Sequence, residues 1–200
     1  MPGRRSCLEM AYTQFRRVEM SQARNQRSWL RFLLVPLWIV AHFAWSDTLS
    51  GRVVSVADGG TVIVLDADHQ QHKIRVSGID APEKSQPFGQ RSKQGMSMLV
   101  FGKQVEVQWS KRDRYRRIIG KVMVAAPSCR TNRCPKTLDA GLAQITTGLA
   151  WWYQKYEKDQ SASDAGRYGF AQQEARAKRA GLWADAHPIP PWDWRKGERL

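Results

Sequence analysis

The chain has the pattern of an α+β protein, in which short strands dominate the first part and helices the second. Apolar residues alternate with polar or small ones in five short stretches between residues 52 and 124, and a period of two is typical of strands. Apolar residues spaced by three and four recur after residue 88 and again after residue 137, which is typical of one helix face. One domain over residues 47–200 accounts for all of these elements.

The first three strands are separated by turn sequences. Their apolar positions are Val54 and Val56, Val62 and Val64, and Ile74 and Val76. Asp58-Gly59-Gly60 separates the first two strands, and residues 66–69 separate the next two. Gly and Asp are the residues that such turns require. Three strands at hairpin spacing predict an antiparallel meander.

A helix and two further strands follow. The helix is predicted over residues 88–101, and Gly102 is a natural stop. Its apolar face carries Phe88, Met96, Leu99 and Val100. Val105 and Val107 alternate with polar residues and predict a fourth strand that leads into Trp109. A fifth strand is predicted over residues 118–124.

Two more helices are predicted before a proline-rich tail. The second helix has apolar residues spaced by four, three and four, at Leu138, Leu142, Ile145 and Leu149. The aromatic residues 151–153 after it are expected to pack against the barrel. A polar connection over residues 157–163 leads to the third helix, around Tyr168 to Ala180. The tail contains prolines that exclude a regular helix, and its tryptophans are expected to attach it to the body of the domain.

The first 46 residues are predicted to be a processing segment. Seven arginines lie between residues 4 and 31, and an apolar run of about 14 residues follows them. The run ends in small residues at Ala44 and Ser46, which fits a secretory signal cleaved after Ser46 and predicts a periplasmic or secreted protein. The run is short of the ~20 residues that span a bilayer as a helix. The alternative is an uncleaved inner-membrane anchor, and Met1, Met10 and Met20 are all possible starts.

The basic charge belongs to the predicted domain and not only to its leader. The whole chain carries a formal net charge of +14. Removing residues 1–46 takes away seven basic and two acidic residues, so +9 remains. A basic domain attracts polyanions, of which nucleic acid is the commonest.

Cysteine usage agrees with export. Loss of the leader removes Cys7 and leaves Cys129 and Cys134, which bracket four residues. This spacing is compatible with a small disulfide loop formed in an oxidising compartment. The alternative is a structural zinc site, which would need four ligands.

Most of the residues with candidate chemistry lie between Arg52 and Glu83. Arg75 closes the third strand, and Asp80 and Glu83 follow in a short loop that Pro82 stiffens. Such a group could form a divalent-metal phosphodiesterase site. Further along, residues 111–117 place five basic residues and one tyrosine around a single aspartate, a composition used by phosphate and base-stacking sites as well as by solvated loops.

Three ordered motifs resemble those of the staphylococcal nuclease (thermonuclease) family, in its exported bacterial form. They are Val-x-Asp-Gly-x-Thr-Val at residues 56–62, Arg-x-x-x-x-Asp-x-Pro-Glu at residues 75–83, and Asp-Arg-Tyr-Arg-Arg at residues 113–117. The match runs from about residue 51 to residue 194. The resemblance implies a five-stranded OB-type β-barrel with three helices.

The resemblance also implies roles for the residues that form the reaction site. Arg75 and Arg117 would bind phosphate, and Glu83 would be the general base. Tyr115 and Arg114 would lie beside the bound nucleotide. The substrate would be DNA or RNA, no protein partner is implied, and the protein is expected to be a monomer.

The cofactor implied by the resemblance is Ca²⁺. Asp80 and the backbone carbonyl of Ala81 would face the ion, with Asp58 as a further ligand. Gly60, however, occupies the position at which the family has a second ligand aspartate, so the metal site is expected to be weakened. Two hypotheses follow: a calcium-dependent endonuclease with reduced activity, and a non-catalytic OB-fold module that binds nucleic acid.

Overall fold

The protein is described by a computed structural model that covers residues 47–129, 131 and 134–197. The predicted leader, with its cleavage site after Ser46, lies outside these residues. Within the described part of the chain, no helix combines the length and the apolar character needed to cross a membrane.

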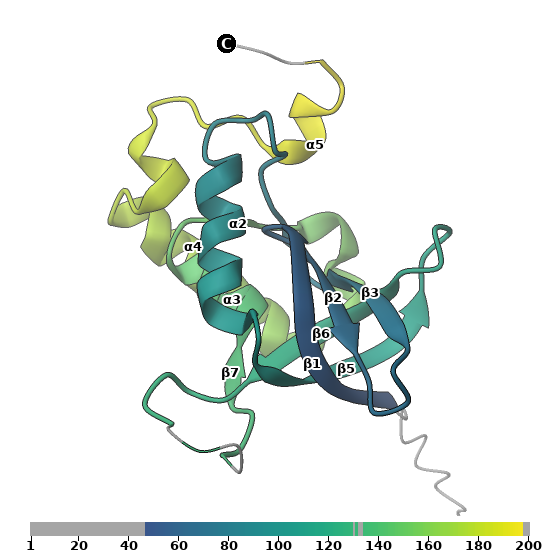
Figure 1. Cartoon of the computed structure of the whole chain (residues 1–200). Coiled ribbons are helices and arrows are strands. Elements are labelled where there is room, and N and C mark those ends of the chain that lie inside the picture. Colours follow the sequence, from purple (N-terminus) through teal and green to yellow (C-terminus); the bar gives the residue numbers. More distant parts are fainter. Residues whose placement is uncertain (1–46, 130, 132–133, 198–200) are drawn as a thin grey trace, which may run out of the picture. The chain divides into compact units, whose positions relative to one another are not determined.

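Five strands form a closed barrel (Figure 1). They are β1 (Asp47–Asp58), β2 (Thr61–Leu65), β3 (Gln71–Val76), β5 (Gln104–Arg112) and β6 (Ile118–Val124). Strand β1 pairs antiparallel with both β2 and β5, while β2 pairs with β3 and β5 with β6. A parallel pairing of β3 with β6 closes the ring. The predicted α+β class with a five-stranded barrel is therefore confirmed.

Strand β1 differs from the predicted alternation at one position. Val53 and Val56 are buried, whereas Val54 is only partly buried. The register with β2 shifts between Val53 and Ser55. This bulge adds a residue to one strand and so changes which side chains face the core. The strand predicted from Val54 and Val56 is present, but the alternation does not identify which of its valines face the core.

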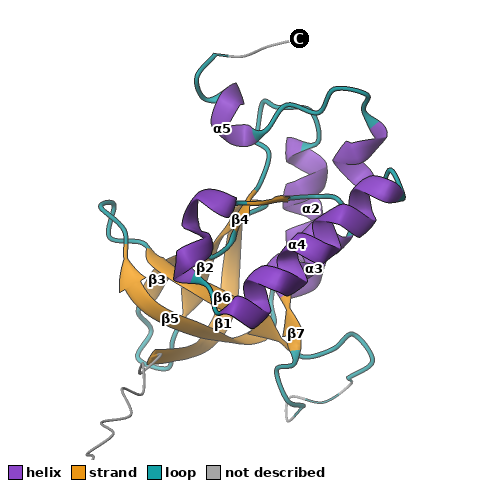
Figure 2. Cartoon of the chain, turned by 180° about the vertical axis from the view of Figure 1, so that it is seen from behind, coloured by secondary structure: helices purple, strands orange, loops and turns teal. Residues whose placement is uncertain are grey.

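Three helices lie together on one side of the barrel (Figure 2). They are α2 (Gly89–Val100), α3 (Ala140–Thr146) and α4 (Ala162–Ala177). Helix α2 ends as predicted: Gly102 has φ 74° and begins the return to β5. Met96 and Val100 of α2 belong to the same buried core as the inward-facing valines of the barrel.

Helix α3 is shorter than predicted because a strand precedes it. Leu138 and Asp139 form β7, which pairs with the end of β6. The buried Asp139 side chain caps α3 by accepting bonds from the backbone N–H groups of Gly141 and Leu142, and it accepts a third bond from the Tyr168 hydroxyl at 2.8 Å. Burial raises the pKa of Asp139 despite these bonds.

Helix α4 starts six residues earlier than Tyr168, where it was expected. Ser161 caps it by accepting a bond from the Asp164 N–H at 3.0 Å, so the C-terminal part of the predicted polar connection is helical. The first three residues of that connection, with the residues before it, form the short 3₁₀ helix η2 (Gln154–Asp159). Helix α4 carries few large apolar residues, which explains why apolar spacing marks it poorly.

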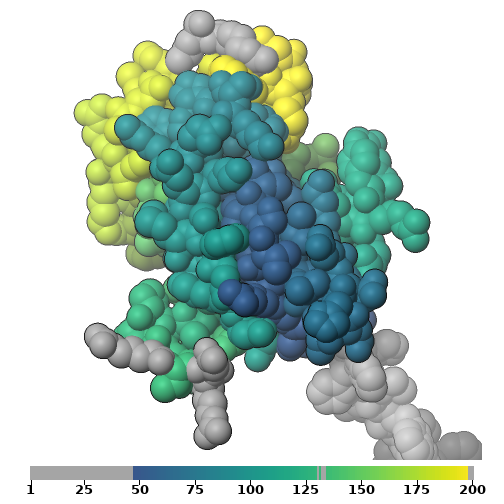
Figure 3. Space-filling model, viewed as in Figure 1, coloured from purple at the N-terminus to yellow at the C-terminus, as the bar shows by residue number. Residues whose placement is uncertain are grey.

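The tail folds back on the body through its aromatic residues, as expected. It contains the 3₁₀ helix η3 (Gly181–Ala184) and one helical turn, α5 (Pro191–Trp194), in which Pro191 takes the first position, where proline is tolerated. Trp151 contacts the rings of Trp183 and Trp192, with centroids 4.3 and 5.6 Å apart. In the space-filling view the C-terminal part of the chain, coloured yellow-green to yellow, borders the start of α2 (Figure 3).

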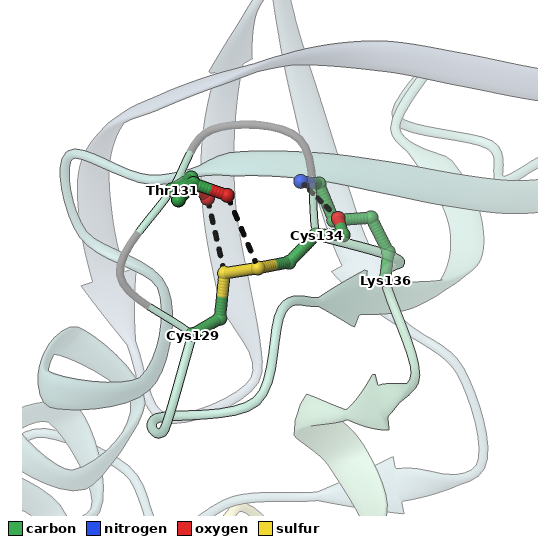
Figure 4. The surroundings of a disulfide bond; sticks show 4 residues. All are labelled: Cys129, Thr131, Cys134 and Lys136. Atoms are coloured by element: carbon green, nitrogen blue, oxygen red, sulfur yellow. Dashed lines mark hydrogen bonds between the residues drawn. A yellow bond between two sulfur atoms is a disulfide. The ribbon is translucent and has the colours of Figure 1, made fainter.

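Cys129 and Cys134 are bonded in a disulfide in the loop between β6 and β7 (Figure 4). Their Cα atoms are 6.2 Å apart. Thr131 lies against both sulfur atoms, with its carbonyl 3.0 Å from Cys129 Sγ and its hydroxyl 3.5 Å from Cys134 Sγ. Among the described residues, no group of His, Cys, Asp and Glu side chains forms a metal cluster, so the zinc alternative has no support there.

Candidate active site

One pocket of about 810 Å³ brings together the residues singled out in the sequence. Its lining includes Asp58, Arg75, Asp80, Ala81, Glu83, Arg114, Tyr115 and Arg117. They come from the β1–β2 turn, β3, the loop after β4 (Ile79–Asp80) and the β5–β6 connection. The pocket has two sides, which we call the carboxylate side (Asp80 and Glu83) and the arginine loop (residues 111–117).

Asp80 is the most deeply buried charge of the pocket. It lies on β4, which pairs with β8 (Trp151–Trp152), and its side chain is 2% exposed. Arg75 donates to Asp80 Oδ1 at 2.6 Å, and Arg195 donates to Asp80 Oδ2 at 2.7 Å. A buried carboxylate needs such partners, because an unpaired charge in this position would be strongly destabilising.

Arg195, which directly follows α5, joins the two carboxylates. Its Nη1 also donates to Glu83 Oε1 at 2.7 Å, so one guanidinium bridges Asp80 and Glu83. Partial burial disfavours the charged form, but the bonds to both carboxylates outweigh it and raise the pKa of Arg195. Gln86 links the same two segments: its side chain accepts from the Glu83 N–H at 3.0 Å and donates to the Ile189 carbonyl at 2.7 Å.

The turn between β1 and β2 lacks a second carboxylate. Asp58 Oδ1 accepts a bond from the Gly60 N–H at 2.8 Å, so one of its oxygens holds the turn itself. An added Cβ at Gly60 would collide with Nη1 of Arg75. The arginine therefore fills the space next to Gly60, and its Nη1 lies 3.4 Å from the Gly60 carbonyl. Asp58 lines the pocket, and its role as a metal ligand stays a prediction.

The arginine loop is organised by Asp113. Its Oδ1 accepts from the backbone N–H groups of Tyr115 and Arg117 at 2.9 and 3.0 Å, and its Oδ2 accepts from Arg117 Nε at 2.7 Å. Burial works to raise the pKa of Asp113, but the bonds from Arg117 and Tyr115 outweigh it and leave the pKa below its usual value. Asp113, four residues before Arg117, thus fixes the guanidinium of Arg117.

Arg116 takes the place where the family usually has Gly. Its φ is 62°, in the left-handed region that glycine adopts most easily. The loop keeps a tight turn, closed by a bond from the Arg116 N–H to the Asp113 carbonyl at 2.9 Å. The substitution therefore adds local strain of about 1 kcal/mol without opening the loop.

Tyr115 is the exposed aromatic group of the pocket. The residue is 64% exposed, and the guanidinium carbons of Arg114 and Arg117 lie 4.8 and 5.4 Å from its ring centroid. An exposed ring with cations beside it is suited to stacking against a base near a phosphate.

The parallel pairing of β3 with β6 explains how the two arginines meet. Arg75 is the register partner of Ile119, which itself lines the pocket. Arg117 is two residues before Ile119, and residues two apart along an extended chain point to the same face. Barrel closure thus brings together two guanidinium groups that lie 42 positions apart in the sequence.

Sequence reasoning missed several residues that line this pocket. Arg195 is the most important, and Tyr153, Lys155 and Tyr156 also contribute. Tyr153 packs against the tail and not, as expected, only against the barrel, since it stacks on Trp192 with ring centroids 5.3 Å apart. The sequence feature that could have pointed to Arg195 is its position directly after the aromatic residues of the tail. These residues form α5 and attach the tail beside Glu83.

The carboxylate side fits a hard cation in part. Asp80 and Glu83 converge on a single cationic side chain, the guanidinium of Arg195. Hard cations use carboxylate, carbonyl and water oxygens, and some are held by one or two carboxylates together with substrate phosphates. Within the described residues, however, no three acidic, His or Cys side chains converge.

Comparison with known proteins agrees with this arrangement. The family described as Staphylococcal nuclease homologue matches residues 73–185. The chain is 39% identical to Protein ParB of Escherichia coli, over 79% of this chain and 85% of that protein. It is 38% identical to an uncharacterized endonuclease of Escherichia coli, over 80% and 95%, and 36% identical to a micrococcal nuclease of Shigella flexneri, over 80% and 88%. The chain belongs to the staphylococcal nuclease family.

Proposed function

We propose that this protein is a calcium-dependent endonuclease that hydrolyses phosphodiester bonds of DNA or RNA. Its relatives include proteins named as endonucleases and as a micrococcal nuclease, which support a nuclease function. The observation that carries the proposal is the convergence of Glu83, Arg75 and Arg117 on one pocket from three separate segments.

Each of these side chains suits one step of hydrolysis. Glu83, half exposed on the pocket wall, can accept the proton of an attacking water molecule. The guanidinium groups of Arg75 and Arg117 can donate to phosphoryl oxygens and stabilise the charge that develops on them. Tyr115 and Arg114 would bind the nucleotide beside the reacting phosphate.

The Ca²⁺ would be held by Asp80, the Ala81 carbonyl and Asp58. When bound, the ion would polarise the phosphate of the substrate. Gly60 brings no carboxylate, and the affinity for calcium falls with ligand charge. We therefore infer a weak metal site that needs more Ca²⁺ than a site with a full ligand set and that supports slow cleavage.

A nuclease assay tests the proposal directly. Protein that begins at Asp47 is incubated with DNA or RNA over a wide range of Ca²⁺ concentrations, with a chelator as the blank. Cleavage should depend on Ca²⁺, and Gly60→Asp should raise it. The new side chain must displace the end of the Arg75 side chain but no backbone atom, so the fold should accept it.

The second candidate function is a binding module without catalysis, and a specific observation favours it. Both oxygens of Asp80 are already bonded to guanidinium groups, and Gly60 supplies no replacement. If Gly60→Asp gives no cleavage at any Ca²⁺ concentration while the protein still binds DNA, the enzyme is excluded and the binding module is correct.

We further propose that the protein is exported and acts as a monomer. The arginine-rich segment, the apolar run that ends at Trp45 and the disulfide between Cys129 and Cys134 support export to the periplasm or the medium. Mass spectrometry of the protein from its native host should give a chain that begins near Asp47. An intact N-terminus in the membrane fraction would instead indicate the anchored form.

A further inference from the structure

The guanidinium of Arg195 is the feature that the proposed reaction leaves unexplained. It lies between the two carboxylates that the reaction needs, at 2.7 Å from Asp80 Oδ2 and 2.7 Å from Glu83 Oε1. Its side chain is 42% exposed. The guanidinium of Arg195 therefore has a route into solvent. Both of its carboxylate partners lie in the pocket wall.

The backbone that carries Arg195 is fixed in place. Trp192 stacks on Tyr153 at 5.3 Å, with ring planes only 7° apart, and contacts Trp151 edge-on. Pro191 is buried. The nearly buried Gln86 bonds the tail carbonyl of Ile189 and the Glu83 N–H with one side chain. The bridge to Asp80 and Glu83 thus rests on an anchored segment, and only the long arginine side chain has to move to break it.

Charge balance explains why a guanidinium is bound there. Asp80 is almost fully buried and needs cationic partners. Gly60 leaves room for the end of Arg75, which takes one oxygen of Asp80. The other oxygen faces Arg195. A divalent cation bound to Asp80 would meet the positive charge of Arg195 at the same carboxylate.

We propose that Arg195 is an internal competitor of the divalent cation: its guanidinium is bound to Asp80 and leaves that carboxylate when the cation binds. This inference rests on the proposed metal-dependent function, and it adds a tail residue that sets the metal affinity. The apparent affinity for metal is then reduced by the free energy needed to release the arginine.

Calcium binding to the full chain measures the competition without any need for activity. We expect Arg195→Gln to bind Ca²⁺ about tenfold more tightly than the wild type in isothermal titration calorimetry, within the range typical of coupling between two ligands. Arg195→Lys should lie between them, because an ammonium is a point charge that lacks the fork needed to bond both carboxylates. Asp80 keeps Arg75 as a partner in both variants, and a thermal melt checks that they fold.

Arg167→Gln is the matched control. It removes the same charge from the chain, but Arg167 lies on α4 and pairs with Asp164 at 3.8 Å, away from the pocket lining. Its calcium affinity should equal that of the wild type. Equal affinities in wild type and Arg195→Gln, or the same gain in Arg167→Gln, would overturn the competition.

Chemical labelling tests whether the side chain leaves. Phenylglyoxal modifies exposed guanidinium groups, and mass spectrometry of the peptides reports each site. Labelling of Arg195 in the wild type should rise as Ca²⁺ is added, while labelling of Arg167 stays constant. Labelling of Arg195 that does not respond to saturating Ca²⁺ would contradict displacement.

The outcomes separate this inference from the proposed function. If the protein has no nuclease activity but Arg195→Gln gains calcium affinity, the proposed competition stands and the proposed enzymatic function fails. If the protein is an active, calcium-dependent nuclease but the wild type and Arg195→Gln bind calcium equally well, the enzymatic function stands and the competition fails.

Discussion

On the carboxylate side of the pocket, Asp80 and Glu83 are held by guanidinium groups, whereas in the arginine loop the guanidinium of Arg117 is held by a carboxylate. Arg75, one partner of Asp80, is five residues away, but Arg195, which bonds both Asp80 and Glu83, lies at a separation of 115 residues from Asp80. The partner of Arg117 is Asp113, only four residues distant. The carboxylate side therefore depends on tertiary contacts, whereas the arginine loop is held by contacts among its own residues.

This difference determines what each side can do when a ligand arrives. The arginine loop is already in position, because Asp113 fixes both its backbone and the Nε of Arg117. On the carboxylate side, Asp80 and Glu83 are paired with guanidinium groups, and the proposed competition would require Arg195 to exchange with the cation. Preorganisation on one side and exchange on the other would give a site that recognises phosphate readily but reacts slowly.

The largest expected effect comes from Glu83→Gln. A general base contributes about 10²–10⁴ in rate, so kcat of the Gly60→Asp variant should fall by that factor when Glu83→Gln is added. The amide keeps the shape and can still contact Arg195, so the thermal midpoint should change little. Cleavage rates at saturating Ca²⁺ measure the effect. Unchanged kcat would mean that another group on the carboxylate side takes the proton.

The next effect concerns the arginine loop. Asp113→Asn weakens the bond to Arg117 Nε and removes the charge that orients it, so kcat/KM should fall by about ten- to a hundredfold through misplacement. Stability should fall by about 1–3 kcal/mol, the range for bonds to a charged group in a largely buried position. Urea unfolding and cleavage rates give both values.

Glu174→Gln is the control for the arginine loop. It removes the same charge from an exposed pair with Lys178 on α4, where stability should change by less than about 0.5 kcal/mol. If Asp113→Asn behaves like this control, the loop does not depend on its aspartate and the comparison between the two sides fails.

A smaller effect should appear with pH. The pKa of Asp113 is lowered in the folded protein from its ordinary value of 3.8. Its contribution to stability is therefore complete above pH 3.8 and is lost as the pH falls through the lowered folded pKa. The stability difference between wild type and Asp113→Asn should shrink over that acidic range, as measured by urea unfolding at several pH values. A constant difference would show that the carboxylate charge is not what holds the loop.

The same division explains what could be predicted from the sequence. The arginine loop is encoded in seven consecutive residues, so its motif and its residues were recognised together. Arg75, Asp80 and Glu83 also lie close in sequence, and a strand followed by a Pro-stiffened loop marks them. Their assembly with Arg117 depends on the parallel pairing of β3 and β6, which no local pattern contains.

Other parts of the fold were missed for related reasons. The bulge in β1 moves Val54 off the core face, and alternation alone does not locate a bulge. Helix α4 has small residues on its buried face, such as Ala165, Ala171 and Ala175, so the cap at Ser161 was the better signal. Arg195 was overlooked because its partners lie at the other end of the domain sequence.

The smallest effect on the pocket should come from the disulfide, which tests whether the two sides form a self-contained site. Cys129 and Cys134 follow the C-terminal end of β6, while Arg117 precedes its first residue, and a strand of this length spans roughly 20 Å. Closing so short a loop should contribute about 2 kcal/mol at most. Reduction should therefore lower the thermal midpoint by a few degrees and leave cleavage and nucleic-acid binding unchanged. A Cys129→Ser, Cys134→Ser variant should show the lower midpoint without reductant and no further response to it. Loss of cleavage on reduction would show that the pocket depends on the far end of β6, and neither side could then be treated as independent of the rest of the barrel.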